Sequence, residues 1–132
     1  MSRIAIQPQL SVFLDNRPGM LARMCQALAK AQINIIALSI LEAVDHAVIR
    51  MVVDKSKEAE QVLANMHALV QRHDVIVMDV PNQVGTLAGI AERLSAAGIN
   101  IEYAYCTSAP SPSAGSIVLR TNNFEETINA LS

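Results

Sequence analysis

Residues 16–22 read NRPGMLA, and residues 82–88 read NQVGTLA, so the pattern Asn-x-x-Gly-x-Leu-Ala occurs twice with a shift of 66 residues. Each copy follows a run rich in β-branched and aliphatic residues and precedes a helical pattern. Each helical pattern then ends in Ile-Asn-Ile, at 33–35 and again at 99–101. Self-similarity at a fixed spacing is typical of chains built from repeated structural units. The chain is therefore predicted to contain two related units.

The composition supports two small units with an aliphatic interior. The chain has 132 residues, of which 52% are hydrophobic, 17% charged and only 3% aromatic. A unit of about 65 residues buries only about 60% of the surface of its unfolded chain, so it is marginally stable alone. We expect the two units to share a core or a sheet, and the chain to form a homo-oligomer, most simply a dimer.

Charge and residue types exclude several functional classes. The net charge is −2, and the aromatic residues that stack on nucleic acid bases are almost missing, which argues against a nucleic acid partner. No apolar run reaches the ~20 residues of a membrane span, and residues 1–8 are too short and polar for a signal peptide. Cytoplasmic localisation is therefore predicted. Cys25 and Cys106 lack the spacing of a metal site, so we predict two buried free thiols and no metal or cofactor.

Periodicity predicts the same element order in both units. The expected first unit is a β-α-β-β-α-β sequence with strands at 9–14, 33–43, 47–53 and 68–70 and helices at 18–32 and 57–66. The expected second unit has strands at 74–80, 99–106 and 115–121, helices at 84–97 and 123–131, and a Ser/Pro-rich loop at 107–114. Asn123 and Glu126 have the spacing of a capping box, and Gly98 suits the position after a helix.

The second unit ends without a fourth strand of its own. Residues 3–6 alternate in character, and we predict that they complete this sheet, from the same chain or from a neighbouring one. The predicted fold class is α+β: two tandem ferredoxin-like units, 1–72 and 73–132, each an antiparallel sheet with two helices on one face.

The two NxxGxLA stretches, each followed by Ile-Asn-Ile, resemble the ACT domain, the small-molecule-sensing module of amino-acid metabolism. The resemblance covers nearly the whole chain and is closest to stand-alone proteins with two ACT repeats. It implies a non-catalytic, regulatory and allosteric role in which an amino acid binds at interfaces between ACT units. Three features depart from the family: Val84 replaces the usual Pro before Gly85, the second unit lacks its last strand, and no catalytic domain is expected beside the two units.

The resemblance also implies which residues bind the ligand, through the loop between the first strand and the first helix of each unit. The residues carried over to the first unit are Asn16, Gly19, Met20, Leu21 and Asn34. Those carried over to the second unit are Asn82, Gly85, Thr86, Leu87 and Asn100. Thr86 and the nearby Tyr103 add polar groups, which favours the second site.

The chemistry of these residues suits an amino acid independently of the resemblance. Free N–H groups at a helix start favour a carboxylate, and glycine allows close approach to the backbone. An Asn side chain offers both a donor and an acceptor for the ligand. Each residue also has a structural interpretation. The Asn of each loop caps its helix, the Asn of Ile-Asn-Ile adopts a left-handed turn, and the Leu lies in the core.

Two other functions remain open on the sequence. One is a non-catalytic assembly or regulatory subunit of an amino-acid biosynthetic enzyme, with no ligand of its own. The other is a small acylphosphatase-like enzyme, for which Arg17 beside Asn16 would cradle an anion. Gln83 stands in place of this arginine in the second unit, and no nucleophile–base pair is visible. The prediction is therefore a regulatory binding protein without catalytic residues.

Overall fold

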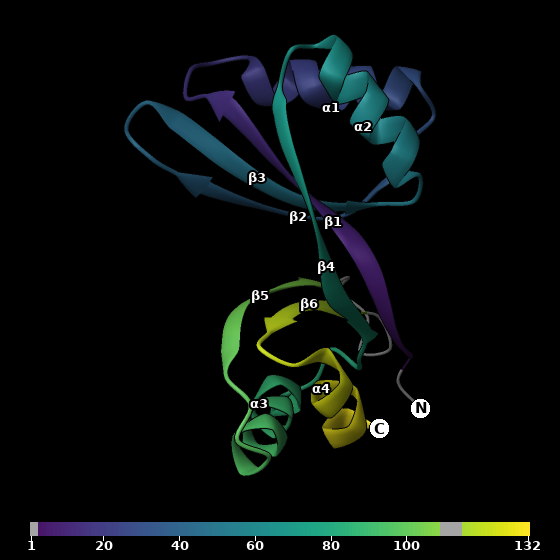
Figure 1. Cartoon of the computed structure of the whole chain (residues 1–132), viewed down its shortest axis with the longest axis vertical. Coiled ribbons are helices and arrows are strands. Elements are labelled where there is room, and N and C mark those ends of the chain that lie inside the picture. The colour runs from purple at the N-terminus through teal and green to yellow at the C-terminus, as the bar shows by residue number, and fades with distance from the viewer. Residues whose placement is uncertain (1–2, 109–114) are drawn as a thin grey trace. The chain divides into compact units, whose positions relative to one another are not determined.

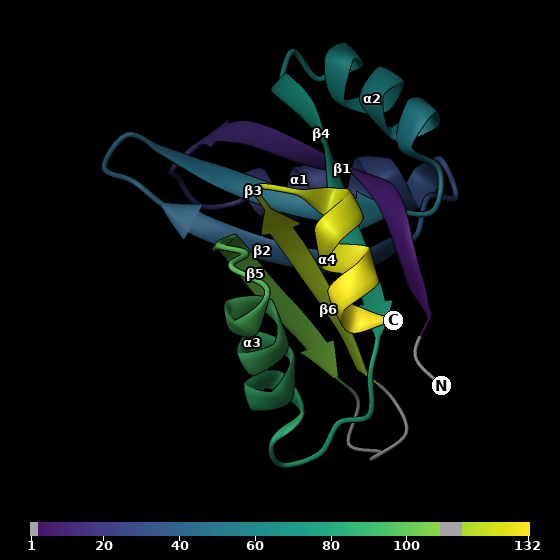
Figure 2. The same cartoon turned by 60° about the horizontal axis from the view of Figure 1, so that its bottom comes forward.

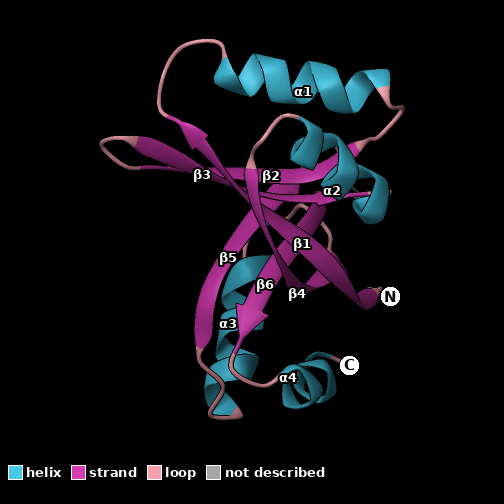
Figure 3. Cartoon of the chain, turned by 45° about the horizontal axis from the view of Figure 1, so that its top comes forward, coloured by secondary structure: helices cyan, strands magenta, loops and turns pink. Residues whose placement is uncertain are grey.

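The computed structural model describes residues 3–108 and 115–132, so residues 109–114 of the predicted Ser/Pro-rich loop lie outside the described part. Strands and helices follow the predicted α+β order (Figures 1 and 3). The strands are β1 Ile4–Asp15, β2 Ile35–Glu42, β3 His46–Val53, β4 Leu69–Asp79, β5 Ile101–Ser108 and β6 Gly115–Thr121. The helices are α1 Met20–Lys30, α2 Ser56–Asn65, α3 Thr86–Ala96 and α4 Phe124–Leu131.

The chain forms two compact units. We call Pro8–His73 the first unit, and Met1–Gln7 with Asp74–Ser132 the second unit. The predicted boundary after residue 72 assigns residues 1–7 to the first unit, whereas these residues group with the second unit in the structure. Strands β1 and β4 therefore each contribute one end to either unit.

In the first unit the strand order is β2-β3-β1-β4, and α1 and α2 lie together on one face of the sheet (Figure 1). Strand β3 pairs antiparallel with both β1 and β2. Side chains alternate between the two faces of a strand, so Leu10, Val12 and Leu14 share the face that packs under the helices. Together with Met24 and Leu28 of α1 they form an aliphatic core.

The second unit repeats this arrangement with the order β5-β6-β4-β1, and α3 and α4 lie side by side (Figure 2). Its core contains Ile76, Leu119 and Leu94, each 0% exposed. The start of β1 supplies the predicted fourth strand from the same chain. The backbone N–H of Asp79 donates to the carbonyl oxygen of Arg3 at 2.9 Å, and Ile4 packs against the core.

The sequence repeat is also a structural repeat, down to its irregularities. The β2–β3 pair has a bulge between Ile35 and Ala37, and the β5–β6 pair has one between Ile101 and Tyr103. The pairing register is the same as well, because Ile40 lies opposite Ile49 as Cys106 lies opposite Ile117. Residues of the two units can therefore be compared position by position.

Several predicted details differ from the structure. Strand β4 is continuous rather than divided into 68–70 and 74–80, and α1 and α3 begin two residues later than predicted. Cys106 is exposed and Cys25 half-buried, although both thiols are free. Two details are confirmed: Asn123 caps α4 by accepting from the Glu126 N–H at 3.0 Å, and Gly98 has a positive φ of 71° after α3.

Deleting residues 1–7 is expected to destabilise the second unit by about 1–3 kcal/mol, because it removes a paired edge strand and the apolar contact of Ile4. Thermal denaturation followed by circular dichroism measures this loss. Arg3→Ala is the matched control, since the Arg3–Asp79 ion pair is 3.9 Å long and largely exposed and contributes little. An unchanged midpoint for the deletion would contradict the role assigned to this strand.

Candidate functional site

The two glycines of the repeated motif shape the starts of α1 and α3. Gly19 and Gly85 are the N-cap residues, with φ values of 88° and 89°, a left-handed conformation that glycine adopts without steric cost. The structural alternative for Asn16 and Asn82, that they cap these helices, is therefore not the arrangement in the structure. Neither helix has a side-chain cap or an acidic residue in its first turn. The N–H groups of Met20 and Thr86 donate to the carbonyl oxygens of Arg17 and Gln83, so an external acceptor would meet the following first-turn N–H groups and the positive end of the helix dipole.

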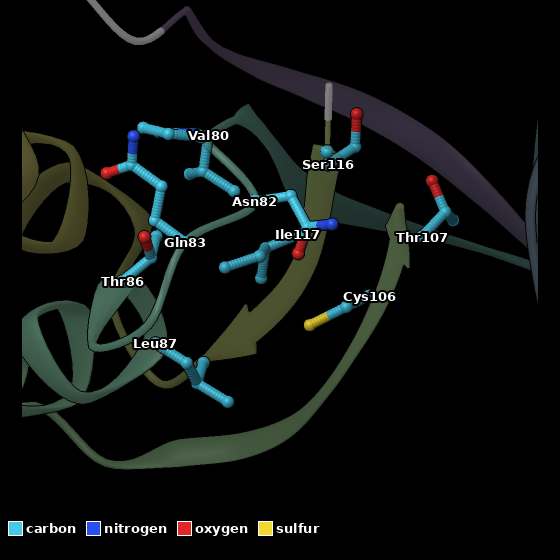
Figure 4. Close-up of a pocket in the computed structure, with 11 residues that line it drawn as sticks. Val80, Asn82, Gln83, Thr86, Leu87, Cys106, Thr107, Ser116 and Ile117 are labelled. Carbon is cyan, nitrogen blue, oxygen red and sulfur yellow. The ribbon is translucent and has the colours of Figure 1, made fainter. Parts of the chain in front are cut away.

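A hollow lies beside the start of α3, entirely within the second unit. Its volume is about 120 Å³, and Figure 4 shows the side chains around it. The lining comes from 80–83 after β4, Thr86 and Leu87 of α3, Cys106 and Thr107 of β5, and 115–117 of β6. At position 115 only a glycine fits without a shift, because a Cβ atom would lie 3.1 Å from the carbonyl oxygen of Val80. The hollow is large enough for a small organic group rather than a single water molecule.

The lining of the hollow has polar groups but no charged residue. In Figure 4 the amide of Asn82 and the thiol of Cys106 point toward the space beside Ile117, and Leu87 lies on the side of α3. Leu87 is 50% exposed, so the prediction that it lies in the core is wrong. Its side chain instead forms part of the apolar wall of the hollow. The hollow therefore combines apolar walls with a few neutral hydrogen-bonding groups.

The rim of the hollow is formed where β5 and β6 pair. Thr107 lies opposite Ser116 on the sheet face that does not carry Cys106 and Ile117. The hydroxyl of Ser116 donates to the carboxylate of Asp79 at 3.2 Å. The rim is therefore tied to the end of β4, from which the motif loop departs.

A second hollow adjoins the first at the α3 start. It has a volume of about 220 Å³ and shares Val80, Pro81 and Thr86 with the first hollow. Gly85, Gly89 and Arg93 line its helix side. Thr86 thus stands between two open spaces at the first turn of α3.

The motif loop of the first unit forms hydrogen bonds within that unit. The side-chain amide of Asn16 donates to the Glu42 carboxylate at 3.2 Å and to the Ala43 carbonyl oxygen at 2.9 Å. Its backbone N–H donates to the carbonyl oxygen of Asp45. Asn16 therefore fastens the loop to the β2–β3 turn. Met20 packs against the first core, and Leu21 is 38% exposed rather than buried as predicted.

Asn34 and Asn100 lie after the ends of α1 and α3, away from the motif loops. The Asn34 N–H donates to Asp54 at 2.9 Å, and the Asn100 N–H donates to Asn122 at 3.3 Å. The left-handed residues at these helix exits are Gln32 and Gly98, so the prediction of left-handed asparagines is wrong. Asn100 lines a separate, shallow hollow, and the structure does not bring either asparagine to the site beside α3.

Of the residues predicted for the second site, the structure gathers Asn82, Thr86 and Leu87 around one hollow and Gly85 at the adjoining one. Motif reasoning missed Cys106, Thr107, Ser116 and Ile117. These residues come from β5 and β6, which carry no recognisable motif. Only the pairing register of the two strands, projected from the first unit, would have indicated them.

Other kinds of site find no support in the described residues. Within 3–108 and 115–132, no three His, Cys, Asp or Glu residues lie together as a metal site would require. None of the helices in this part of the chain has the length and hydrophobicity needed to cross a membrane.

Comparison with known proteins identifies what the chain resembles. The sequence matches the profile described as an ACT domain pair over residues 4–131. The structure is similar to that of protein BT0572 from Bacteroides thetaiotaomicron, with a TM-score of 0.88 and 34% identity, covering 97% of this chain and 88% of the other. The ligand-free regulatory subunit of aspartate kinase from Thermus thermophilus shares the fold, with a TM-score of 0.70, 18% identity and coverage of 97% and 93%. No match is found among curated proteins.

Proposed function

The chain belongs to the ACT domain family as a pair of such domains, and we propose that it is a regulatory protein whose second unit binds a free amino acid. The family supports a regulatory role in small-molecule binding. We further propose that the ligand is an amino acid, that it binds in the second unit, and that the protein acts by binding and is not an enzyme.

The observation that carries the proposal is the uncapped start of α3 beside a neutral hollow. The N-cap Gly85 provides no side-chain acceptor, and no carboxylate lies in the first turn. A ligand carboxylate would accept from the first-turn N–H groups after Thr86, whose own N–H donates to the Gln83 carbonyl oxygen, and would interact favourably with the helix dipole. The remainder of a small amino acid then faces Asn82, Cys106 and Ile117 in the hollow.

A thermal-shift screen against the twenty amino acids tests this function. A ligand present at 100 times its dissociation constant stabilises the native state by about 2.7 kcal/mol. For a chain of this size the midpoint then rises on the order of 10 °C. We expect at least one amino acid to produce a shift of this kind, whereas its decarboxylated amine should produce none. A flat response to all twenty would overturn the proposal.

A second candidate function is that of a regulatory or assembly subunit for an amino-acid biosynthetic enzyme, as in the aspartate kinase subunits that share the fold. Exposed apolar side chains on the first unit favour a protein contact of this kind. They are Ile36, Ile40, Leu41 and Val44, which are 39%, 48%, 56% and 94% exposed. The same surface supports our proposal of a homodimer, which light scattering checks by mass. We place the protein in the cytoplasm, where its two free thiols stay reduced.

A further inference from the structure

The two units differ at positions that border the hollow. Thr86, at the first helical position of α3, corresponds to Met20 at the first position of α1. Cys106 in β5, opposite Ile117, corresponds to Ile40 in β2, opposite Ile49. At both positions a long apolar side chain of the first unit is replaced in the second by a shorter one that can hydrogen-bond.

These replacements bear directly on the space available in each unit. Met20 packs against the core beneath α1, so its side chain occupies the region at the helix start. Ile40 keeps the equivalent strand position apolar and is 48% exposed. In the second unit Thr86 and Cys106 both line the hollow of about 120 Å³. Thr86 and Cys106 thus contribute two of the polar groups of the hollow.

We propose that Thr86 and Cys106 determine the ligand class of the second unit, which accepts a small amino acid with an uncharged, hydrogen-bonding side chain, one per chain. This inference rests on the proposed function. We infer that the first unit takes no such ligand, because the longer apolar side chains of Met20 and Ile40 stand at these two positions.

Because the lining is uncharged, we expect the hollow to favour an amino acid without a charged side chain. A charged ligand side chain that loses part of its hydration against this lining gains no ion pair in return, because no Lys, Arg, His, Asp or Glu lines the hollow. The hydroxyl of Thr86, the thiol of Cys106 and the amide of Asn82 instead match a hydroxyl or carboxamide. A site that hydrogen-bonds such a group discriminates strongly against an analogue that lacks it.

Isothermal titration calorimetry on the full chain tests the ligand class with pairs of similar shape. The probes are L-threonine against L-valine, and L-asparagine against L-aspartate, with L-lysine as the cationic case. We expect the preferred ligand to be a neutral hydrogen-bonding one, at a stoichiometry of one per chain, and at least 10-fold tighter than its apolar or charged counterpart.

The variants come from the first unit of the same chain, whose fold already accommodates them. Thr86→Met and Cys106→Ile are each expected to weaken binding at least 10-fold, and the double variant to abolish it. Their melting temperatures without ligand should stay at or above that of the wild type. Ser95→Ala is the matched control, because Ser95 is an exposed residue of α3 whose first-unit counterpart is Ala29.

A second readout does not depend on any variant. Cys106 is exposed at the hollow, so the bound ligand should slow its alkylation by iodoacetamide, while half-buried Cys25 serves as the internal reference. If the wild type binds none of the twenty amino acids, the proposed function and this inference both fail. If it binds a charged amino acid best, binds two per chain, or is unaffected by Thr86→Met and Cys106→Ile, this inference alone is overturned.

Discussion

Replacing Leu94 by alanine is expected to destabilise the second unit by about 2–5 kcal/mol. Leu94 is 0% exposed and belongs to the core between α3 and the sheet, so truncation leaves a cavity in a closely packed interior. Leu28→Ala should cost the first unit a similar amount, because Leu28 occupies the equivalent position of α1 and is also 0% exposed. Urea denaturation followed by circular dichroism measures both losses.

The control for this prediction lies on the same helix. Leu87 is 50% exposed at the edge of the hollow, and Leu87→Ala should cost much less stability than Leu94→Ala. Equal losses for Leu87→Ala and Leu94→Ala would show that the core assignment along α3 is wrong. A loss below about 1 kcal/mol for Leu94→Ala would show that no closed core exists there.

Gly85→Ala should lower stability and ligand affinity together, whereas Gly19→Ala should lower stability alone. Both glycines have a positive φ near 90°, and a Cβ atom would meet nothing within 4 Å at either position. The cost is therefore conformational, about 1–2 kcal/mol for a residue forced into the left-handed region. Only Gly85 precedes the helix start that borders the hollow, so only its variant should lose affinity, by at least 10-fold in calorimetry.

Gly89→Ala provides the opposite control for stability. Gly89 lies inside α3 without a positive φ, and nothing lies within 4 Å of its added Cβ. Alanine should therefore stabilise the helix by about 0.5–1 kcal/mol. If Gly19→Ala weakened binding as much as Gly85→Ala, the assignment of the site to the second unit would be wrong.

The repeated motif and periodicity predicted the element order, the α+β class and the strand that residues 3–6 add to the second unit. These features depend on local signals: alternation in strands, a 3.6-residue stripe in helices, and glycine at positions with positive φ. The helix starts were placed two residues early because Pro18 is favoured in a first helical turn, and the second helix was started at Val84, in the same position of the repeat. Here the preceding turn assigns the cap position to Gly19 and Gly85.

Only part of the candidate site could be predicted from the sequence. Its loop half, with Asn82, Thr86 and Leu87, carries the motif, whereas its strand half depends on which residues of β5 and β6 face one another. Leu87 and Cys106 lie far apart in the sequence, and only the pairing of the strands brings them to the same hollow. No local sequence pattern indicates that pairing. The same limitation explains Asn34 and Asn100, which occur in the repeated Ile-Asn-Ile string but lie at the opposite ends of their helices.

The two copies of the motif loop have different surroundings. One motif loop is bonded to its own hairpin through Asn16, and the other borders a neutral hollow through Asn82 and Thr86. We propose that the first copy serves structure and protein contacts and that the second copy senses the ligand. That division is what the experiments above distinguish.

The most direct measurement is a crystal structure of the chain with the amino acid that raises its melting temperature most. The account predicts ligand density in the hollow of the second unit, with the carboxylate at the first turn of α3 and the side chain beside Cys106 and Ile117. Density at the Asn16 loop, with the hollow beside Thr86 empty, would contradict it.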